Sequence, residues 1–265
     1  MAGRVRSTVE AFGRLRRSRK VADRIPRGLR ILDLALIFLT LPLLLPLALL
    51  VAVAVFLDSP GPVLYRSQRI GKGGLLFEML KFRTMKRDAE GPPLSAAGDE
   101  RYTPLGRRLA ISRLDELPQI WNVLKGDMRL VGPRPEVEGF VAAYAGEYEC
   151  ILSVPPGLTG PAQVEYAWEG KELAKAQAID RARVYRESIQ PYKLAIDLTY
   201  VKHHSVVGDL TLLARTFVLP LHRIAVRMVE TMPGRTFMAR LAPGLVACGV
   251  LLVFMAIYAL EAGAA

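Results

Sequence analysis

Cysteine is scarce in this chain, and its two cysteines, Cys150 and Cys248, lie far apart. Neither their number nor their spacing suggests a disulfide framework or a metal site, and a reducing compartment fits both. The N-terminus is too charged for a secretory signal peptide and lacks a small-residue cleavage site. No zinc-finger spacing, RNP-like aromatic motif or heptad zipper is present, which argues against a nucleic-acid partner.

Charge is absent from Leu34–Leu57, where Thr40 is the only ordinary polar residue. About 20 such residues suffice to cross a bilayer as a helix. Pro42 and Pro46 interrupt the segment, and a proline removes a helical hydrogen bond. Basic residues flank both ends, so a crossing helix would violate the positive-inside rule at one of them. We therefore predict a re-entrant membrane helix over residues 30–58, with a kinked spanning helix as the alternative.

Positive charge is concentrated in residues 1–29, which are predicted to form a basic arm. Residues 1–30 hold ten of the basic side chains and only two acidic ones, in a chain of net charge +11. Such an arm beside an apolar segment suits the anionic cytoplasmic leaflet of a membrane. Asp33 lies at the apolar boundary, where a carboxylate is costly unless paired. Arg30, one helical turn earlier, is its expected partner.

The rest of the chain divides into three further segments. Residues 59–217 are predicted to form an α/β domain, mostly helical with short strands, on the cytoplasmic face. Within it, Val63–Tyr65 and Leu75–Phe82 alternate apolar and polar residues as in a hairpin. Residues 218–240 are predicted to form an interfacial helix or linker. The uncharged segment 241–260 is predicted to be a C-terminal transmembrane helix, with a hydrophobic helix packed on its own domain or on a partner as the alternative.

The densest group of chemically active residues is Ser112–Gln119. Its adjacent carboxylates, Asp115 and Glu116, are surrounded in the sequence by arginines and lysines. Phosphoryl transfer uses this combination, because cations and Mg²⁺ hold phosphate oxygens while a carboxylate binds the metal or attacks phosphorus. A structural interpretation also fits, since Ser112 and Asp115 have the spacing of a capping box. The residues alone leave both interpretations open.

Further cations accompany this pair in the sequence. Lys81 and Arg83 are spaced to share one face of a strand. Arg134 lies between Pro133 and Pro135, in a stiff loop that suits bidentate phosphate binding. Any one of these residues, taken singly, would by default be solvated surface charge.

Several motifs in this order resemble the bacterial sugar transferases, the monotopic phosphoglycosyl transferases of the undecaprenyl-phosphate type. The resemblance covers about residues 27–217 and rests on these runs: Asp58-Ser-Pro-Gly-Pro62, Gln68-Arg-Ile-Gly-Lys72, Lys81-Phe-Arg-Thr-Met85, Leu114-Asp-Glu-Leu-Pro-Gln119 continuing to Asp127, Val131-Gly-Pro-Arg-Pro135, Pro156-Gly-Leu-Thr-Gly160 and Lys193-Leu-Ala-Ile-Asp197.

The resemblance implies a two-step mechanism. Asp115 would attack the sugar-linked phosphate of a UDP-sugar, expel UMP and form an acyl-phosphate. Undecaprenyl phosphate would then take up the phosphosugar, in the first membrane step of surface glycan assembly. Mg²⁺ would assist, with Glu116, beside Asp115, as its expected ligand. Arg30 and Asp33 would begin the re-entrant helix, and Pro46 would break it.

The resemblance also implies a site and a location. The expected substrate and phosphate contacts are Lys81, Arg83, Arg113, Gln119 and Arg134. This chain departs from the family where Leu45 replaces a common serine and where Ala110 replaces a common basic residue, so we expect Arg113 to take over phosphate contacts. The expected location is the bacterial inner membrane, facing the cytoplasm. The sugar is not readable, a homodimer is possible, and a non-catalytic membrane-docked scaffold is the alternative function.

Overall fold

The computed structural model describes residues 27–89, 91, 94–96, 98–166 and 169–216. Most of the predicted basic arm and the predicted segments 218–240 and 241–260 lie outside these residues. The chain divides into two units, residues 1–202 and 203–265, which are described separately.

The described part is mostly helical with short strands, as predicted. Its helices are α2 (Arg27–Asp58), η2 (Lys72–Gly74), α3 (Pro104–Ser112), η3 (Leu114–Glu116), α4 (Gln119–Lys125), α5 (Glu138–Ala143), α6 (Ala145–Ile151), α7 (Pro161–Glu165), α8 (Glu169–Ala174), α9 (Arg181–Val184), the π-helix η4 (Tyr185–Ile189) and α10 (Gln190–His203). Its strands are β1 (Leu64–Ile70), β2 (Leu76–Phe82), β3 (Arg129–Val131) and β4 (Gly157–Thr159).

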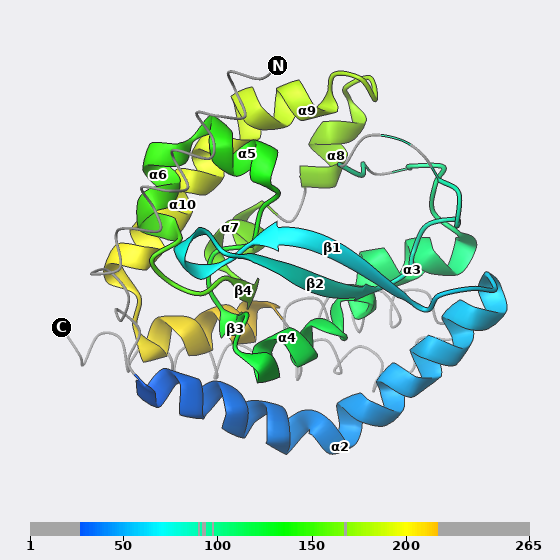
Figure 1. Cartoon of the computed structure of the whole chain (residues 1–265), viewed down its shortest axis with the longest axis horizontal. Helices are drawn as coiled ribbons and strands as arrows, with labels where there is room; N and C mark the ends of the chain where they lie inside the picture. Colours follow the sequence, from blue (N-terminus) through cyan, green and yellow to red (C-terminus); the bar gives the residue numbers. More distant parts are fainter. Residues whose placement is uncertain (1–26, 90, 92–93, 97, 167–168, 217–265) are drawn as a thin grey trace, which may run out of the picture. The chain divides into compact units, whose positions relative to one another are not determined.

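Helix α2 is, in the described residues, the one helix long and apolar enough to cross a membrane, with a mean hydropathy of 2.8. Pro42 and Pro46 both lie inside it, and the ribbon bends near its middle (Figure 1). Each proline lacks the N–H that would close a helical hydrogen bond. The hydroxyl of Thr40 also donates to the carbonyl of Leu36 at 2.8 Å, a contact that often bends helices.

The two faces of α2 meet different surroundings. On one face Ile37, Val51 and Val55 are buried against the rest of the domain. On the other, Leu39 and Leu43 are 78% and 74% exposed, and many further large apolar side chains of the helix are exposed with them. A continuous apolar surface of this kind is typical of a lipid-facing or partner-facing segment. The helix is therefore packed along one side and exposes apolar side chains on the other.

Arg30 and Asp33, both near the start of α2, bind separate partners. Asp33 is 2% exposed and accepts hydrogen bonds from Arg129 at 2.9 and 3.3 Å. Arg30 donates at 2.5 and 2.9 Å to the carbonyls of Val123 and Leu124, in the last turn of α4. The predicted Arg30–Asp33 pair is therefore wrong. The open carbonyls of a helix end attract a cation, and the buried guanidinium of Arg129 requires a carboxylate.

The described residues form two small sheets of two strands each. Strands β1 and β2 form the predicted antiparallel hairpin, with Leu64 opposite Phe82 and Ile70 opposite Leu76. Strands β3 and β4 pair in parallel. Backbones approach closely beside this second pair, because a Cβ on Gly157 would lie 2.1 Å from the Gly132 nitrogen. Only glycine fits such an approach.

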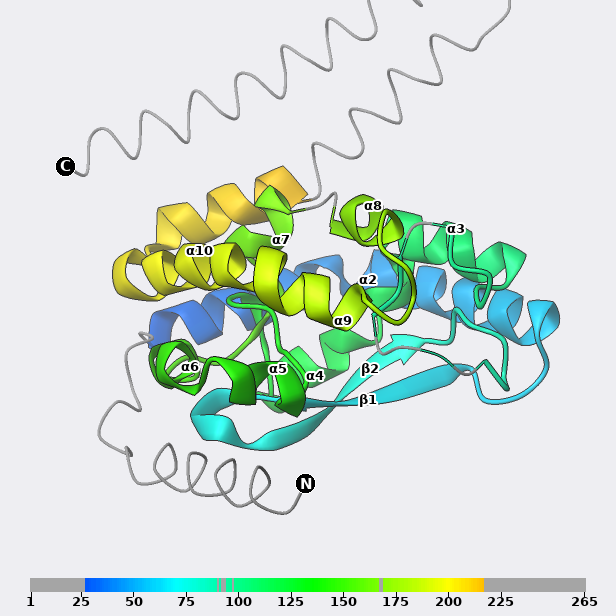
Figure 2. The same cartoon turned by 90° about the horizontal axis from the view of Figure 1, so that it is seen from above.

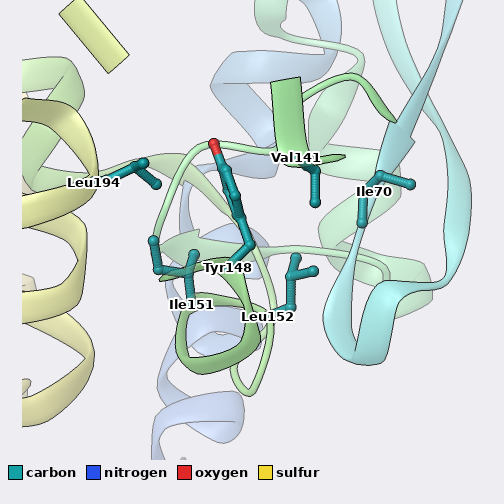
Figure 3. Packing of buried hydrophobic residues seen from close by; sticks show 6 residues of the cluster. All are labelled: Ile70, Val141, Tyr148, Ile151, Leu152 and Leu194. Carbon is teal, nitrogen blue, oxygen red and sulfur yellow. The ribbon is translucent and has the colours of Figure 1, made fainter. Parts of the chain in front are cut away.

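A hydrophobic cluster joins the hairpin to the helical side of the domain. It contains Ile70 of β1, Val141 of α5, Tyr148 and Ile151 of α6, Leu152, and Leu194 of α10 (Figure 3). Figure 2 shows α5 and α6 between α10 and the hairpin. A second cluster gathers around Phe140 and Tyr185, whose ring centroids are 4.7 Å apart. It includes the buried Ala96, so the chain between β2 and α3 is packed against the core at this point.

The described part of the second unit contains a helix over residues 206–216. Ser205 stands before it, and its hydroxyl accepts a hydrogen bond from the Gly208 N–H at 3.0 Å. This contact satisfies one of the open donors of the first turn, as an N-cap serine does.

We predict that Asp33→Leu lowers the free energy of unfolding by about 3–5 kcal/mol, because it leaves the Arg129 charge buried without a counter-ion. Denaturant unfolding of the detergent-solubilised protein, followed by tryptophan fluorescence, measures the change. The exposed pair of Arg66 and Glu78, with side chains 66% and 46% exposed, supplies the control. Glu78→Gln is expected to cost less than about 1 kcal/mol. Adding Arg129→Met to Asp33→Leu should recover much of the loss, and no recovery would contradict the pairing.

Candidate active site

The acidic pair lies on the short helix η3 between α3 and α4. Leu114 and Leu117, which flank the pair, are three residues apart and therefore share a face of this tight helix. Both pack against the cluster of α2 residues that includes Val55. Packing of the two leucines toward α2 leaves Asp115 and Glu116 on other faces of the turn. The three-residue spacing of the leucines in the sequence thus decides which side of the segment carries the carboxylates.

Two cations from other parts of the chain converge on this pair. The Nζ of Lys81, on β2, lies 3.1 Å from Glu116 Oε1 and 3.8 Å from Asp115 Oδ2. Arg134, in the loop after β3, donates to Glu116 Oε1 at 2.6 Å and contacts Oε2 at 3.5 Å. Both carboxylates are largely buried, at 7% and 9% exposed. The structure therefore brings together four of the residues that the sequence singled out.

The capping interpretation of the acidic pair is wrong. Ser112 is the last residue of α3, and its hydroxyl donates to the Leu109 carbonyl at 3.1 Å. The residue before η3 is Arg113 and the one before α4 is Pro118, and neither gives a side-chain cap. Because no cap explains the carboxylates, their burial beside two cations needs another explanation.

The two carboxylates have opposite electrostatic environments. Burial raises the pKa of Asp115 above its usual value, and the attraction of Lys81 offsets this only in part. Burial also acts to raise the pKa of Glu116, but Arg134 and Lys81 outweigh it and hold that pKa well below its usual range. Glu116 is thus a permanent anion bound by two cations. Asp115 is a desolvated carboxylate whose charge is less fully compensated, which is the environment of a reactive group.

Asn122 of α4 fixes the position of Lys81, and the sequence argument did not identify it. Its side-chain oxygen accepts from the Leu80 N–H at 3.0 Å, and its amide nitrogen donates to the Glu78 carbonyl at 2.7 Å. The buried side chain therefore makes the backbone hydrogen bonds that a neighbouring strand would make at the edge of β2. The only signal for it in the sequence is its place in the run from Leu114 to Asp127.

Arg134 is positioned by its loop and by a buried network behind it. The loop packs against the Pro155–Gly157 backbone, since a Cβ on Gly132 would lie 2.8 Å from the Pro155 oxygen. Two residues further on, Glu136 accepts a short hydrogen bond from the Tyr185 hydroxyl. Lys193 donates to that hydroxyl at 3.0 Å. Sequence reasoning missed this network, whose members come from distant elements.

The other predicted site residues have different surroundings. The Arg83 guanidinium donates to the Ser59 carbonyl, away from the acidic pair, and its Nη1 and Nε have no protein partner among the described residues. Gln119 is fully buried, and neither atom of its amide has a partner in that same part of the chain. Arg113 is exposed. Gln119 is therefore an unsatisfied buried amide close to the acidic pair in the sequence.

Arg113 is, among the described residues, the one non-glycine residue with a positive φ, at 58°. This left-handed conformation costs about 1–2 kcal/mol for an L-residue, and such strain often accompanies functional sites. It reverses the chain between α3 and η3. The turn thereby sets the direction from which the acidic pair is presented.

We predict that Arg113→Gly changes the free energy of unfolding by less than about 1 kcal/mol, because relief of strain and added unfolded-state entropy nearly cancel. Arg113→Ile should destabilise by more than about 1 kcal/mol, since a β-branched residue is disfavoured at positive φ. Thermal unfolding of the two variants measures the difference. Equal melting temperatures would contradict a left-handed residue here.

Comparison with known proteins places this arrangement in a family. Residues 27–223, more than half of the chain, match the family described as bacterial sugar transferase. The UDP-glucose:undecaprenyl-phosphate glucose-1-phosphate transferase of Caulobacter vibrioides is 40% identical over 192 residues, or 71% of this chain and 67% of that protein. The exopolysaccharide production protein PSS of Rhizobium leguminosarum is 36% identical over 68% of this chain and 88% of its own length.

In a longer relative, less than half of the protein aligns with this chain. The UDP-N-acetylgalactosamine-undecaprenyl-phosphate N-acetylgalactosaminephosphotransferase of Aeromonas hydrophila is 36% identical over 72% of this chain, which covers 42% of that protein. Residues 27–223, which match the family, contain α2, the hairpin, the acidic pair and the Arg134 loop. The chain belongs to the bacterial sugar transferase family.

Proposed function

We propose that this protein transfers a phosphosugar from a UDP-sugar to undecaprenyl phosphate and releases UMP. The observation that carries the proposal is the asymmetric pair: Glu116 is bound by two cations, whereas the one ion pair of Asp115 among the described residues is to Lys81, at 3.8 Å. The names of the similar Caulobacter and Aeromonas proteins describe this class of reaction. The reaction would form a step of surface glycan assembly.

Asp115 is the nucleophile in this proposal. One of its carboxylate oxygens forms a bond to the β-phosphorus of the UDP-sugar, and the bond from that phosphorus to the bridging oxygen breaks, releasing UMP. A phosphate oxygen of undecaprenyl phosphate then attacks the same phosphorus and breaks the bond to Asp115. The products are undecaprenyl diphosphate-sugar and the original carboxylate. Splitting the transfer into two displacements is how a covalent nucleophile lowers the barrier.

Lys81 and Arg134 stabilise the negative charge that develops on the transferred phosphoryl group. Both lie at the acidic pair before substrate binds, because Glu116 holds them there. Cations that are already positioned need no reorganisation during the reaction. We propose that Arg113 and Gln119 contact other parts of the substrate, and that Arg83 contributes phosphate binding through its unpartnered nitrogens.

The donor set fits Mg²⁺ bound jointly by protein and substrate. Among the described residues no group of three or more metal-ligating side chains occurs, and Mg²⁺ is commonly held by one or two carboxylates together with substrate phosphates. Glu116 would hold the ion through Oε2, whose contact to Arg134 is long at 3.5 Å, and Asp115 would lie beside it. When bound, Mg²⁺ would neutralise charge on the diphosphate.

We propose that α2 is re-entrant and that the domain faces the cytoplasm at the bacterial inner membrane. Both halves of α2 contact the same domain, the first through Asp33 and Arg129 and the second through Val51 and Val55. A domain on one side of a membrane cannot contact both ends of a helix that crosses it. The bend of α2 (Figure 1), a helix that contains Pro42 and Pro46, allows both contacts. A lipid phosphate at this interface would be close to Asp115.

A non-catalytic scaffold explains less of the structure. Membrane docking by α2 requires neither the buried acidic pair nor the convergence of Lys81 and Arg134 upon it. Buried charges of this kind are costly to a protein that makes no use of them.

We predict that Asp115→Asn reduces UMP release more than about 10³-fold, because an amide cannot form the acyl-phosphate. UMP release from a panel of UDP-sugars, with undecaprenyl phosphate and Mg²⁺, measures the loss. Without the lipid acceptor, the wild type should retain label from a UDP-sugar labelled in the β-phosphate, and the variant should not. Asp180→Asn is the matched control, since this aspartate is exposed and pairs with Arg183. Turnover persisting in Asp115→Asn would refute the covalent mechanism.

The raised pKa of Asp115 predicts the pH profile. Attack requires the carboxylate, so kcat/KM should fall as the pH drops through the pKa of Asp115, above the usual aspartate value of about 3.9. Lys81→Met removes the strongest attraction that lowers this pKa. In Lys81→Met, the fall of kcat/KM on the acid side is therefore expected at higher pH than in the wild type. The variant should also be slower at every pH. A fall that stays in place or moves to lower pH would contradict the assignment.

A further inference from the structure

Tyr65 lies directly across the hairpin from Lys81. The two residues are paired in the antiparallel register of β1 and β2. Directly opposite residues project from the same face, with Cβ atoms about 4.5–5.5 Å apart. Lys81 reaches Glu116 and Asp115 from this face. The tyrosine ring therefore lies beside Lys81, the residue proposed to bind the substrate phosphate.

The ring is open to solvent although its neighbours on the same face are covered. Tyr65 is 56% exposed, whereas Met79 is 1% exposed and Ser67 is 9% exposed. Large aromatic side chains normally bury most of their surface. A half-exposed ring beside a cluster of cations and carboxylates is therefore available to a ligand.

The hairpin has a second face, opposite to the one that carries Tyr65 and Lys81, and this second face packs on α2. Phe82 follows Lys81 in β2, and successive strand residues project to opposite faces. Phe82 packs against Val51 and Val55 of α2. The face that carries Tyr65 and Lys81 therefore points away from α2, which argues against a role for Tyr65 as an interfacial membrane anchor.

We propose that the ring of Tyr65 is the surface on which the uracil base of the nucleotide substrate stacks. This inference rests on the proposed function and adds a binding position for the base to it. The cations Lys81 and Arg134 hold the diphosphate, and the nucleoside extends from it along the hairpin toward Tyr65. Stacking uses the flat face of both rings, so the tyrosine hydroxyl is not required.

The test is the affinity of the purified full-length protein for UMP, measured by isothermal titration calorimetry in the presence of Mg²⁺. A base stacked on an aromatic ring contributes about 1–3 kcal/mol, which corresponds to about 5-fold to 150-fold in affinity. Tyr65→Ala is expected to weaken UMP binding within this range, and Tyr65→Phe to stay within about 2-fold of the wild type. Tyr192→Ala is the control, because this tyrosine of α10 is similarly exposed, at 62%, and should have no effect.

Inorganic pyrophosphate serves as a probe without a base. Its affinity should be unchanged in Tyr65→Ala, and an equal loss for pyrophosphate and UMP would overturn the proposal by showing that Tyr65 supports the cation cluster instead. Unchanged UMP affinity in Tyr65→Ala would also overturn the proposal. This holds even if the variant binds the intact UDP-sugar more weakly, because UMP carries the same base.

Wild-type turnover, measured in parallel, separates this inference from the proposed function. A wild type that releases UMP while Tyr65→Ala binds UMP normally refutes only the stacking. A wild type that neither binds UMP nor releases it from any UDP-sugar refutes both.

Discussion

The ion pairs of Glu116 with Lys81 and Arg134 join three segments that are far apart in the sequence. Lys81 comes from the hairpin, Arg134 from the loop after β3, and Glu116 from the turn that packs on α2. A buried carboxylate of this kind is stable only with cations beside it. The requirement for charge compensation thus fixes the relative positions of the segments. It also leaves the cations at the place where a substrate phosphate would bind.

Helix α2 and the site are parts of one packing arrangement. Leu114 and Leu117 pack toward the second half of α2, and the adjacent carboxylates consequently face the hairpin. At the other half, Arg30 binds the last carbonyls of α4, the helix that follows the acidic pair. Asn122 of α4 in turn binds the edge of β2 and so places Lys81. Through these contacts, the position of the bent helix determines how the acidic pair lies relative to the bilayer that we propose surrounds α2.

The asymmetry within the acidic pair gives each carboxylate a different role. Glu116 is neutralised by two cations and held in place, so it organises charge, whereas Asp115 is desolvated with weaker compensation. Adjacent residues in one turn would have similar environments if solvent surrounded them. Burial separates them, because the side-chain directions on η3 present Glu116 to both cations and Asp115 to one. Asp115, the nucleophile that we propose, therefore lies beside a neighbour that binds the cations.

The sequence by itself determined the apolar helix, the hairpin, the acidic pair and a set of candidate cations for it, because hydrophobic runs, strand alternation and motif order are local properties. It also indicated the family, through the order of motifs such as Asp-Glu-Leu-Pro-Gln at residues 115–119. Only the tertiary structure decided which charges meet. Asp33 pairs with Arg129 instead of Arg30, Arg83 binds the turn at Ser59, and Asn122 and Glu136 support the site without any local signal. Partners of a buried charge are chosen by packing between distant segments, and neighbours in the sequence do not reveal that packing.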